Sequence, residues 1–525
     1  MEQLNNPLPT QEEKQAVVEA VYQKQESPLL LQVRQNFGLY GGISLTFGGG
    51  FALLFYKAWV GWNVLLYSAL IIALLIIVMS KLTTKIKTGT KFYFAAVIML
   101  GISSALTSND VLLFFNIIAI LILLDISLLH QFYDVEKWEF ARHFGKMIGM
   151  VFGSIASIWM PFADSLNFFK KTRVLKNDLF RNIVIGIVIS LPILYITTAL
   201  LSSADLLFGS LANNVFKAVF SADIFWIGCM VVFGMLASYC ILCASVSKVG
   251  IQDKKAIVKL DASIAATVMT ILCLVYAYFC ILQVVYLFTG GLFTLPEAYT
   301  FAEYARRGFF ELMWVTGINI ALMIISRTLF KESKFLSILV VFMTVCTYIM
   351  IGSAAYRMIL YISVYHLSFL RLFVLLILII EVFILAGVII SEFHKKFQLF
   401  SYSVAVVAVC YIAFSLGKPD VWIASYLIDH EKSLTIEDLS YLTSELSLDA
   451  APIVLTVIGD EKRWENEDIN SDNSGYDLEG SYNPLVKNYY HRIDEVNKDI
   501  HVRDFNYSNY KAGQVAKQYP NKATN

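Results

Sequence analysis

The stretch LFVLLILIIEVFILAGVII, residues 372–390, decides the fold. Its only ionisable side chain is Glu381 at the centre, and all other residues are apolar or small. A helix that crosses a bilayer needs about 20 mostly apolar residues, and its backbone polar groups must pair within the segment because lipid offers them no partner. The stretch therefore predicts a transmembrane helix.

Similar stretches recur along most of the chain. We expect spans at 38–57, 61–79, 92–107, 111–129, 182–203, 224–246, 262–288, 309–326, 335–355, 372–390 and 399–416, with a further apolar run at 145–163. Hydrophobic residues make up 57% of the chain and charged residues only 16%, whereas a soluble domain has about 25% charged residues. The predicted fold class is all-α, a polytopic transmembrane bundle of about 11–12 spans with a small C-terminal extramembrane helical tail.

The apolar run at 145–163 determines the predicted topology. Residues 1–417 contain thirty Lys and Arg, and these divide fifteen to fifteen between the two sides if all twelve segments cross. If 145–163 lies in or re-enters the membrane without crossing, the division becomes twenty-four to six. Short cytoplasmic loops carry an excess of Lys and Arg, so the second arrangement is favoured. A non-crossing segment at 92–107 would give twenty-one to nine.

This topology predicts a cytoplasmic N-terminus and an external or periplasmic tail. Within the same apolar run, Gly145, Gly149 and Gly153 repeat every four residues. Such small residues let two membrane helices approach closely, so we expect this stripe to form a helix contact.

The chain divides into five regions by composition. A polar N-terminal segment, 1–37, precedes the transmembrane domain at 38–417. The tail begins with 418–458, where helix-start signals predict a helical pair. Residues 459–483 are acidic and rich in Asn, Ser and Gly, which is typical of a flexible linker, and 484–525 form an aromatic and charged segment.

Several stretches resemble one bacterial membrane family. They are LLSSADLLF (200–208), TFAEYARRGFFELMWVTGINIAL (300–322), YRMILYISVYHLSFLRL (356–372), LSYLTSELSLDAAP (439–452) and RDFNYSNYKA (503–512). The chain resembles the uncharacterised family of domain of unknown function 4173 over roughly residues 180–515. His366 stands where that family has a glycine, which leaves open whether the backbone has a glycine-type geometry there. The resemblance implies a multi-spanning protein of the bacterial inner membrane and carries no established activity.

Ionisable residues inside spans are the first functional candidates, because placing one in the hydrocarbon costs at least about 2.5 kcal/mol. Glu381 has nine apolar or small residues on either side, and Asp125 lies near the end of the 111–129 span. Each could serve a transport or sensing step. Each could instead make an interhelical hydrogen bond that fixes packing.

Two further polar stretches approach the membrane. Arg306, Arg307 and Glu311 lie at the start of the 309–326 span, with Asn319 deeper in it. The arginines could bind an anion or lipid headgroup or form an interfacial ion pair with Glu311. Arg357, Tyr361 and Tyr365 share one helical face before Arg371, at the entrance of the Glu381 span. Such a face suits either a cavity wall or a helix lying at the interface.

Several function classes find no support in the sequence. It contains no nucleotide-binding, nucleophile or His-Glu-x-x-His motif, so we predict no catalytic residues, no metal and no cofactor. The formal charge is zero, which gives no reason to expect nucleic acid as a partner. Membrane lipids are the expected partners, and the tail could receive an unidentified protein.

The favoured function is therefore a small-solute or ion permease, or an accessory subunit of one. The alternative is a structural, sensory or assembly protein whose membrane part anchors the tail.

Overall fold

The computed structural model describes residues 27–519 except 59, 83–84, 136–137, 172–185, 187–189, 191–192, 195, 199, 203–204, 206–221, 250–258, 289–300, 432–433, 459–477 and 499–500. Side chains at 171, 222, 286–288, 301–308 and 478–483 also lie outside the description. More than half of the predicted span 182–203 and most of the predicted linker 459–483 therefore lie outside the described residues.

The membrane part is built from long apolar helices. They are α3 (Phe37–Phe55), α4 (Trp62–Leu82), α5 (Thr88–Leu106), α6 (Asp110–Phe132), α11 (Ala222–Val246), α12 (Ala262–Phe288), α13 (Phe301–Leu329), α14 (Lys334–Tyr365), α15 (Phe369–Phe393) and α16 (Leu399–Leu416). Ten described helices are long and apolar enough to cross a membrane, or up to twelve if each of two bent helix pairs is one span. The predicted all-α membrane fold is confirmed. The helices exceed the predicted spans mainly at their polar ends.

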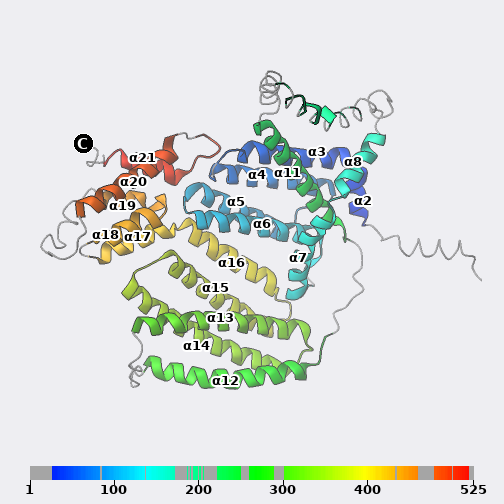
Figure 1. The fold of residues 1–525 in the computed structure, drawn as a ribbon. Helices are drawn as coiled ribbons and strands as arrows, with labels where there is room; N and C mark the ends of the chain where they lie inside the picture. The colour runs from blue at the N-terminus through cyan, green and yellow to red at the C-terminus, as the bar shows by residue number, and fades with distance from the viewer. Residues whose placement is uncertain are drawn as a thin grey trace, which may run out of the picture.

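The long helices form two groups (Figure 1). The first half comprises α3–α6 and α11, and the second half comprises α12–α15. Helix α16 lies between them, in contact with α5 and α15. Each half has its own cluster of buried apolar side chains.

The two ends of the bundle differ. At one end, the short helix α2 (Pro28–Gln35) reaches the α4–α5 connection, where Gln32 Nε2 donates to the Lys81 carbonyl (3.3 Å). We call this the basic end, because Lys81, Lys85 and Lys87 lie around the α4–α5 connection, and the described residues near the ends of α7 and α11 include Arg142, Lys146 and Lys248. The opposite end holds the tail (Figure 1) and is called the tail end.

The run at 145–163 is folded as two helices at the basic end. Helices α7 (Phe140–Ala156) and α8 (Met160–Lys171) are bent by 51° relative to each other. Figure 1 shows them turned across the direction of α3–α6 rather than alongside it. Asp164 of α8 holds this arrangement, because its carboxylate receives hydrogen bonds from Arg34 Nε (3.0 Å) and the Tyr239 hydroxyl (3.0 Å).

The tail is a small helical unit with a buried core of its own. It consists of α17 (Pro419–His430), α18 (Ile436–Ser440), a π-turn (Tyr441–Glu445), a 3₁₀ turn (Leu448–Ala450), α19 (Ala451–Ile458), α20 (Leu478–Lys498) and α21 (Tyr507–Ala516). Thr435 and Asp438 form a capping box at the start of α18.

Candidate functional site

A cavity of about 200 Å³ lies at the tail end of the second half. Helices α13, α14 and α15 each contribute to its wall, through Phe309, Tyr361 and Arg371 among others. The Arg371 guanidinium lies 4.4 Å from the centre of the Tyr361 ring, and its Nη1 donates to the carbonyls of Tyr365 (2.5 Å) and His366. The cavity therefore combines an apolar wall with a guanidinium held in place by the end of α14.

The backbone beside this cavity is strained. His366, which ends α14, has φ 63° and ψ 177°. This region is essentially restricted to glycine, and other residues adopt it at a cost of about 1–3 kcal/mol. His366 thus adopts a glycine-type geometry without being glycine. Strain of this kind persists where the surroundings enforce it, here through the Arg371 contacts and a 3.4 Å approach of His366 Nε2 to Glu431 of the tail.

Glu381 lies deeper on the same face of α15. It follows the cavity residue Val374 by two helical turns, which places it about 10 Å further into the bundle. Its side chain is buried and lies next to Thr316 of α13, whose hydroxyl donates to the Met313 carbonyl (2.8 Å). A Cβ added to Gly317 would lie 3.9 Å from Oε1. The other oxygen, Oε2, has no hydrogen-bond partner among the described residues.

Asn319 continues this polar line one turn beyond Thr316. Its Nδ2 donates to the Thr347 hydroxyl of α14 (3.1 Å) and approaches Met350 Sδ (3.9 Å). Its Oδ1, like Glu381 Oε2, is buried without a hydrogen-bond partner in the described part of the chain. The second half thus contains two buried oxygen atoms whose hydrogen-bonding capacity is unused by the described protein atoms.

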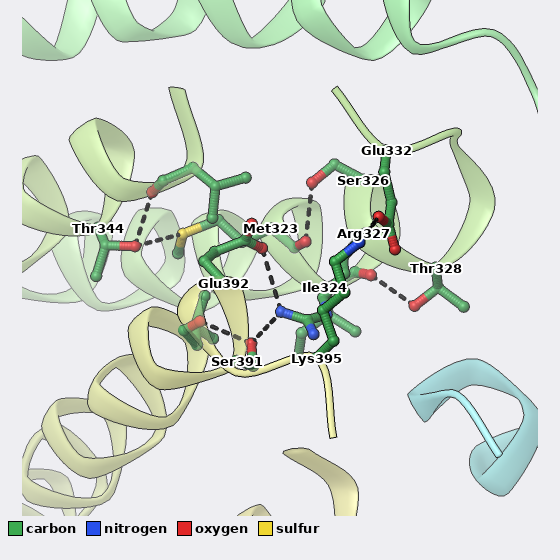
Figure 2. A network of polar contacts seen from close by, with 12 residues as sticks. Met323, Ile324, Ser326, Arg327, Thr328, Glu332, Thr344, Ser391, Glu392 and Lys395 are labelled. Atoms are coloured by element: carbon green, nitrogen blue, oxygen red, sulfur yellow. Dashed lines mark hydrogen bonds and ion pairs between the residues drawn. The ribbon is translucent and has the colours of Figure 1, made fainter. Parts of the chain in front are cut away.

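A charged network closes the second half at the basic end (Figure 2). Arg327, in the last turn of α13, donates from Nη1 to the Ser391 hydroxyl (2.5 Å) and to Glu392 Oε1 (3.3 Å) of α15. Lys395 pairs with Glu332 (2.5 Å) just outside it. These contacts tie α13 to α15 at the end opposite the cavity.

The remaining predicted residues are distributed around this line. Arg357 is buried and donates to Gln283 Oε1 of α12 (3.3 Å), and Tyr365 packs its exposed ring 5.0 Å from Tyr361. Glu311 is exposed. Arg306 and Arg307 belong to α13, but their side chains lie outside the described residues, so both the anion contact and the ion pair with Glu311 stay predictions.

Asp125 is separate from all of these groups. It belongs to α6 in the first half, and its Oδ2 is buried without a hydrogen-bond partner among the described residues. The structure therefore does not bring Asp125 and Glu381 into one site.

Sequence reasoning missed a buried polar cluster in the first half. Asn116 of α6 donates to Ser104 of α5 (3.2 Å), and its Oδ1 accepts from the hydroxyls of Tyr411 (2.9 Å) and Ser415 (3.0 Å) of α16. Ser415 also shares a hydrogen bond with Ser103 (2.6 Å). Uncharged residues of this kind are common in spans, so only their contacts distinguish them.

It also missed the acidic residues that dock the tail. Asp449 accepts hydrogen bonds from the Thr107 hydroxyl (2.5 Å) and the Ser108 backbone (2.9 Å) in the α5–α6 connection. Asp420 accepts from Asn109 Nδ2 (2.8 Å) in the same connection, and its burial raises the pKa of its carboxyl. Asp449 lies in one of the stretches that carried the family resemblance, and that was the available signal.

The glycine stripe of α7 has one helix contact. A Cβ at Gly153 would lie 3.6 Å from Ala244 Cβ of α11. At Gly145 and Gly149 an added Cβ would meet no atom within 4 Å, and both residues line a second cavity. A second helix therefore comes into van der Waals contact only at Gly153, while the other two glycines border open space.

Comparison with known proteins places the chain in a family whose function is not established. Among the described residues, no group of three or more His, Cys, Asp or Glu is placed to hold a metal. No curated protein and no solved structure matches the chain. A family model described as domain of unknown function (DUF4153) matches residues 94–457, which corrects the family number 4173 suggested by the motifs. The chain is therefore a multi-pass membrane protein that belongs to the DUF4153 family.

Proposed function

We propose that this protein is a permease for a small solute or ion, or an accessory subunit of one, and that its second half carries the path. The observation that supports this proposal is that buried polar groups, Glu381 and Asn319, continue from the Arg371 cavity deeper into the second half. Intramembrane ionisable groups that face the bundle interior typically mark solute or ion pathways. The unused capacity of Glu381 Oε2 and Asn319 Oδ1 suits groups that bind a solute during part of a cycle.

The two ends of this line suggest which state the structure represents. The cavity lies at the tail end, whereas the Arg327 network joins α13 to α15 at the basic end. The buried apolar residue Leu378 lies on α15 between the cavity residue Val374 and Glu381. The arrangement fits a path that is closed at the basic end and reached from the tail end after a local opening.

The proposed orientation follows from the division of Lys and Arg. The tail end carries six of the thirty Lys and Arg of residues 1–417 in the favoured topology, and the basic end carries twenty-four. We therefore assign the basic end to the cytoplasm and the tail to the external or periplasmic side of a bacterial inner membrane. The position of α2 and the tail at opposite ends of the bundle supports this assignment (Figure 1).

Thiol labelling tests the path directly. Thr316→Cys should react with a small charged, membrane-impermeant thiol reagent added to intact cells, because the position next to Glu381 becomes hydrated when the path opens. The matched control is Ile318→Cys on the lipid-exposed face of α13, where the reagent should not react. The seven native cysteines set the baseline, so labelling is compared with the unsubstituted chain.

Each result of this experiment is informative. If Thr316→Cys were labelled only in inverted vesicles, the proposed path would stand and the proposed orientation would be reversed. Labelling no higher than that of Ile318→Cys from either side would contradict the permease.

The alternative is a scaffold that anchors the tail. The observation in its favour is that the tail has its own core and docks through buried carboxylates at Asp420 and Asp449. A scaffold needs no hydrated position beside Glu381, so the same labelling experiment separates the two functions.

A further inference from the structure

A second cavity, of about 360 Å³, lies at the basic end of the first half. It is an open cavity lined by α7 and by residues at the C-terminal ends of α6 and α11. Its described lining includes three basic side chains, Arg142, Lys146 and Lys248, and no acidic one. Tyr133 and Ser247 add hydroxyl groups. The cavity therefore has the charge and hydrogen-bonding character of a site for a phosphate-bearing anion.

The glycines of α7 create much of this space. Gly145 and Gly149 lie on the same helical face as Arg142 and Lys146, and a Cβ at either glycine would meet nothing within 4 Å. Close helix packing thus explains Gly153 but not the other two. Small residues at 145 and 149 leave room for a group beside the basic side chains.

The position of α7 relates this cavity to the membrane surface. The face of α7 that does not line the cavity exposes large apolar side chains, including Phe144, Val151, Phe152 and Ile155. An amphipathic helix with such a face lies in the interfacial plane, with its apolar side chains among the acyl chains. The cavity is therefore expected at the depth of the lipid headgroups, on the side that carries most of the Lys and Arg.

We propose that this cavity binds the headgroup of an anionic phospholipid. Basic pockets between membrane helices at the cytoplasmic surface bind such headgroups, and the apolar lining residues Leu129 and Met150 suit the glycerol and the first acyl carbons. A lipid with two phosphates offers these basic side chains more anionic oxygens than a lipid with one, so it binds more tightly. The site is independent of the Glu381 line and of the permease function.

Native mass spectrometry of the full-length protein in mild detergent tests this site. The probes are cardiolipin, which has two phosphates, phosphatidylglycerol, which has one, and zwitterionic phosphatidylcholine. The expected order of retention is cardiolipin, then phosphatidylglycerol, then phosphatidylcholine. Lys248→Gln should weaken cardiolipin binding about fivefold, since one basic residue at an anionic surface contributes about that factor.

Filling the cavity gives the sharper test. Gly149→Leu should reduce cardiolipin retention about tenfold, because the side chain enters space that the headgroup needs, and its open surroundings should keep the protein folded. The matched control is Gly352→Leu, at another helical glycine with no atom within 4 Å of an added Cβ, and Lys334→Gln controls for the loss of one positive charge at the basic end. Neither control should change retention.

Two results would overturn the proposal. One is equal cardiolipin retention by the unsubstituted protein, Lys248→Gln and Gly149→Leu. The other is binding of inorganic phosphate that Lys248→Gln abolishes while cardiolipin retention is unaffected, which would assign the cavity to a free anion. If Gly149→Leu does not accumulate, the cardiolipin retention of Lys248→Gln compared with that of Lys334→Gln still tests the proposal.

Discussion

Two buried asparagines, Asn116 in the first half and Asn319 in the second half, differ in how fully their hydrogen-bonding capacity is used. In the first half, Asn116 uses both its amide nitrogen and its amide oxygen, and three helices meet on it. In the second half, Asn319 makes one hydrogen bond of ordinary length, and Glu381 keeps one oxygen without a partner among the described residues. Saturated networks fix helix packing, whereas buried groups with unused capacity need another explanation. The contrast fits a packing role for the Asn116 cluster and the role proposed above for the Glu381 line.

The largest expected effect comes from Asn116→Leu. It removes three hydrogen bonds among α5, α6 and α16, and should lower the free energy of unfolding by about 2–4 kcal/mol. Thermal unfolding of the protein in detergent, followed by size-exclusion fluorescence, measures this. Asn319→Leu is the matched variant and should lower the free energy of unfolding clearly less than Asn116→Leu does. Equal losses would remove the distinction between the halves.

An intermediate test uses Glu381. Because one carboxylate oxygen is unpartnered, Glu381→Leu should change the unfolding free energy by no more than about 1 kcal/mol, as buried charges replaced by apolar groups often do. Both Glu381→Leu and Glu381→Gln should fail to complement deletion of the gene, while Glu332→Gln, in the exposed pair with Lys395, should complement it. Glu381 would become a packing residue if Glu381→Leu lost stability while Glu381→Gln complemented fully.

The smallest effect is expected at Thr347. Thr347→Val keeps the side-chain shape and removes the hydroxyl to which Asn319 donates. It should lower the free energy of unfolding by about 0.6 kcal/mol, the usual contribution of one interhelical hydrogen bond in a membrane bundle. A double-mutant cycle with Asn319→Leu measures the coupling. A coupling energy above about 2 kcal/mol would show that the second half is held together like the first.

The sequence predicts the helices of this protein better than it predicts their contacts. Apolar length alone identifies α15, and Glu381 stands out because its neighbours are all apolar or small. Hydropathy has no information on which helices meet, so Asn116 could not be recognised as a junction. Asp420 and Asp449 lie in a polar tail where carboxylates are common, and only the fold shows that they are buried.

The glycine stripe of α7 illustrates the same limit. A repeat of small residues predicts that something comes close to the helix, and it does not say whether that is another helix or a cavity. Gly153 meets Ala244, but Gly145 and Gly149 face open space. The difference arises because α11 ends at Val246, close to Ala244, so the rest of α7 extends past it.

The docked tail has a mechanical consequence for the two halves. It is held to the first half by Asp449 at the α5–α6 connection and by the bond from the Trp62 backbone to the Phe505 carbonyl (3.0 Å). It also reaches the second half, where Glu431 approaches His366. Because the tail contacts both halves at the tail end, the halves can separate only at the basic end. In any rigid-body rotation of the halves relative to each other, the axis would therefore lie next to the tail. The largest displacement would occur near α7 and α8.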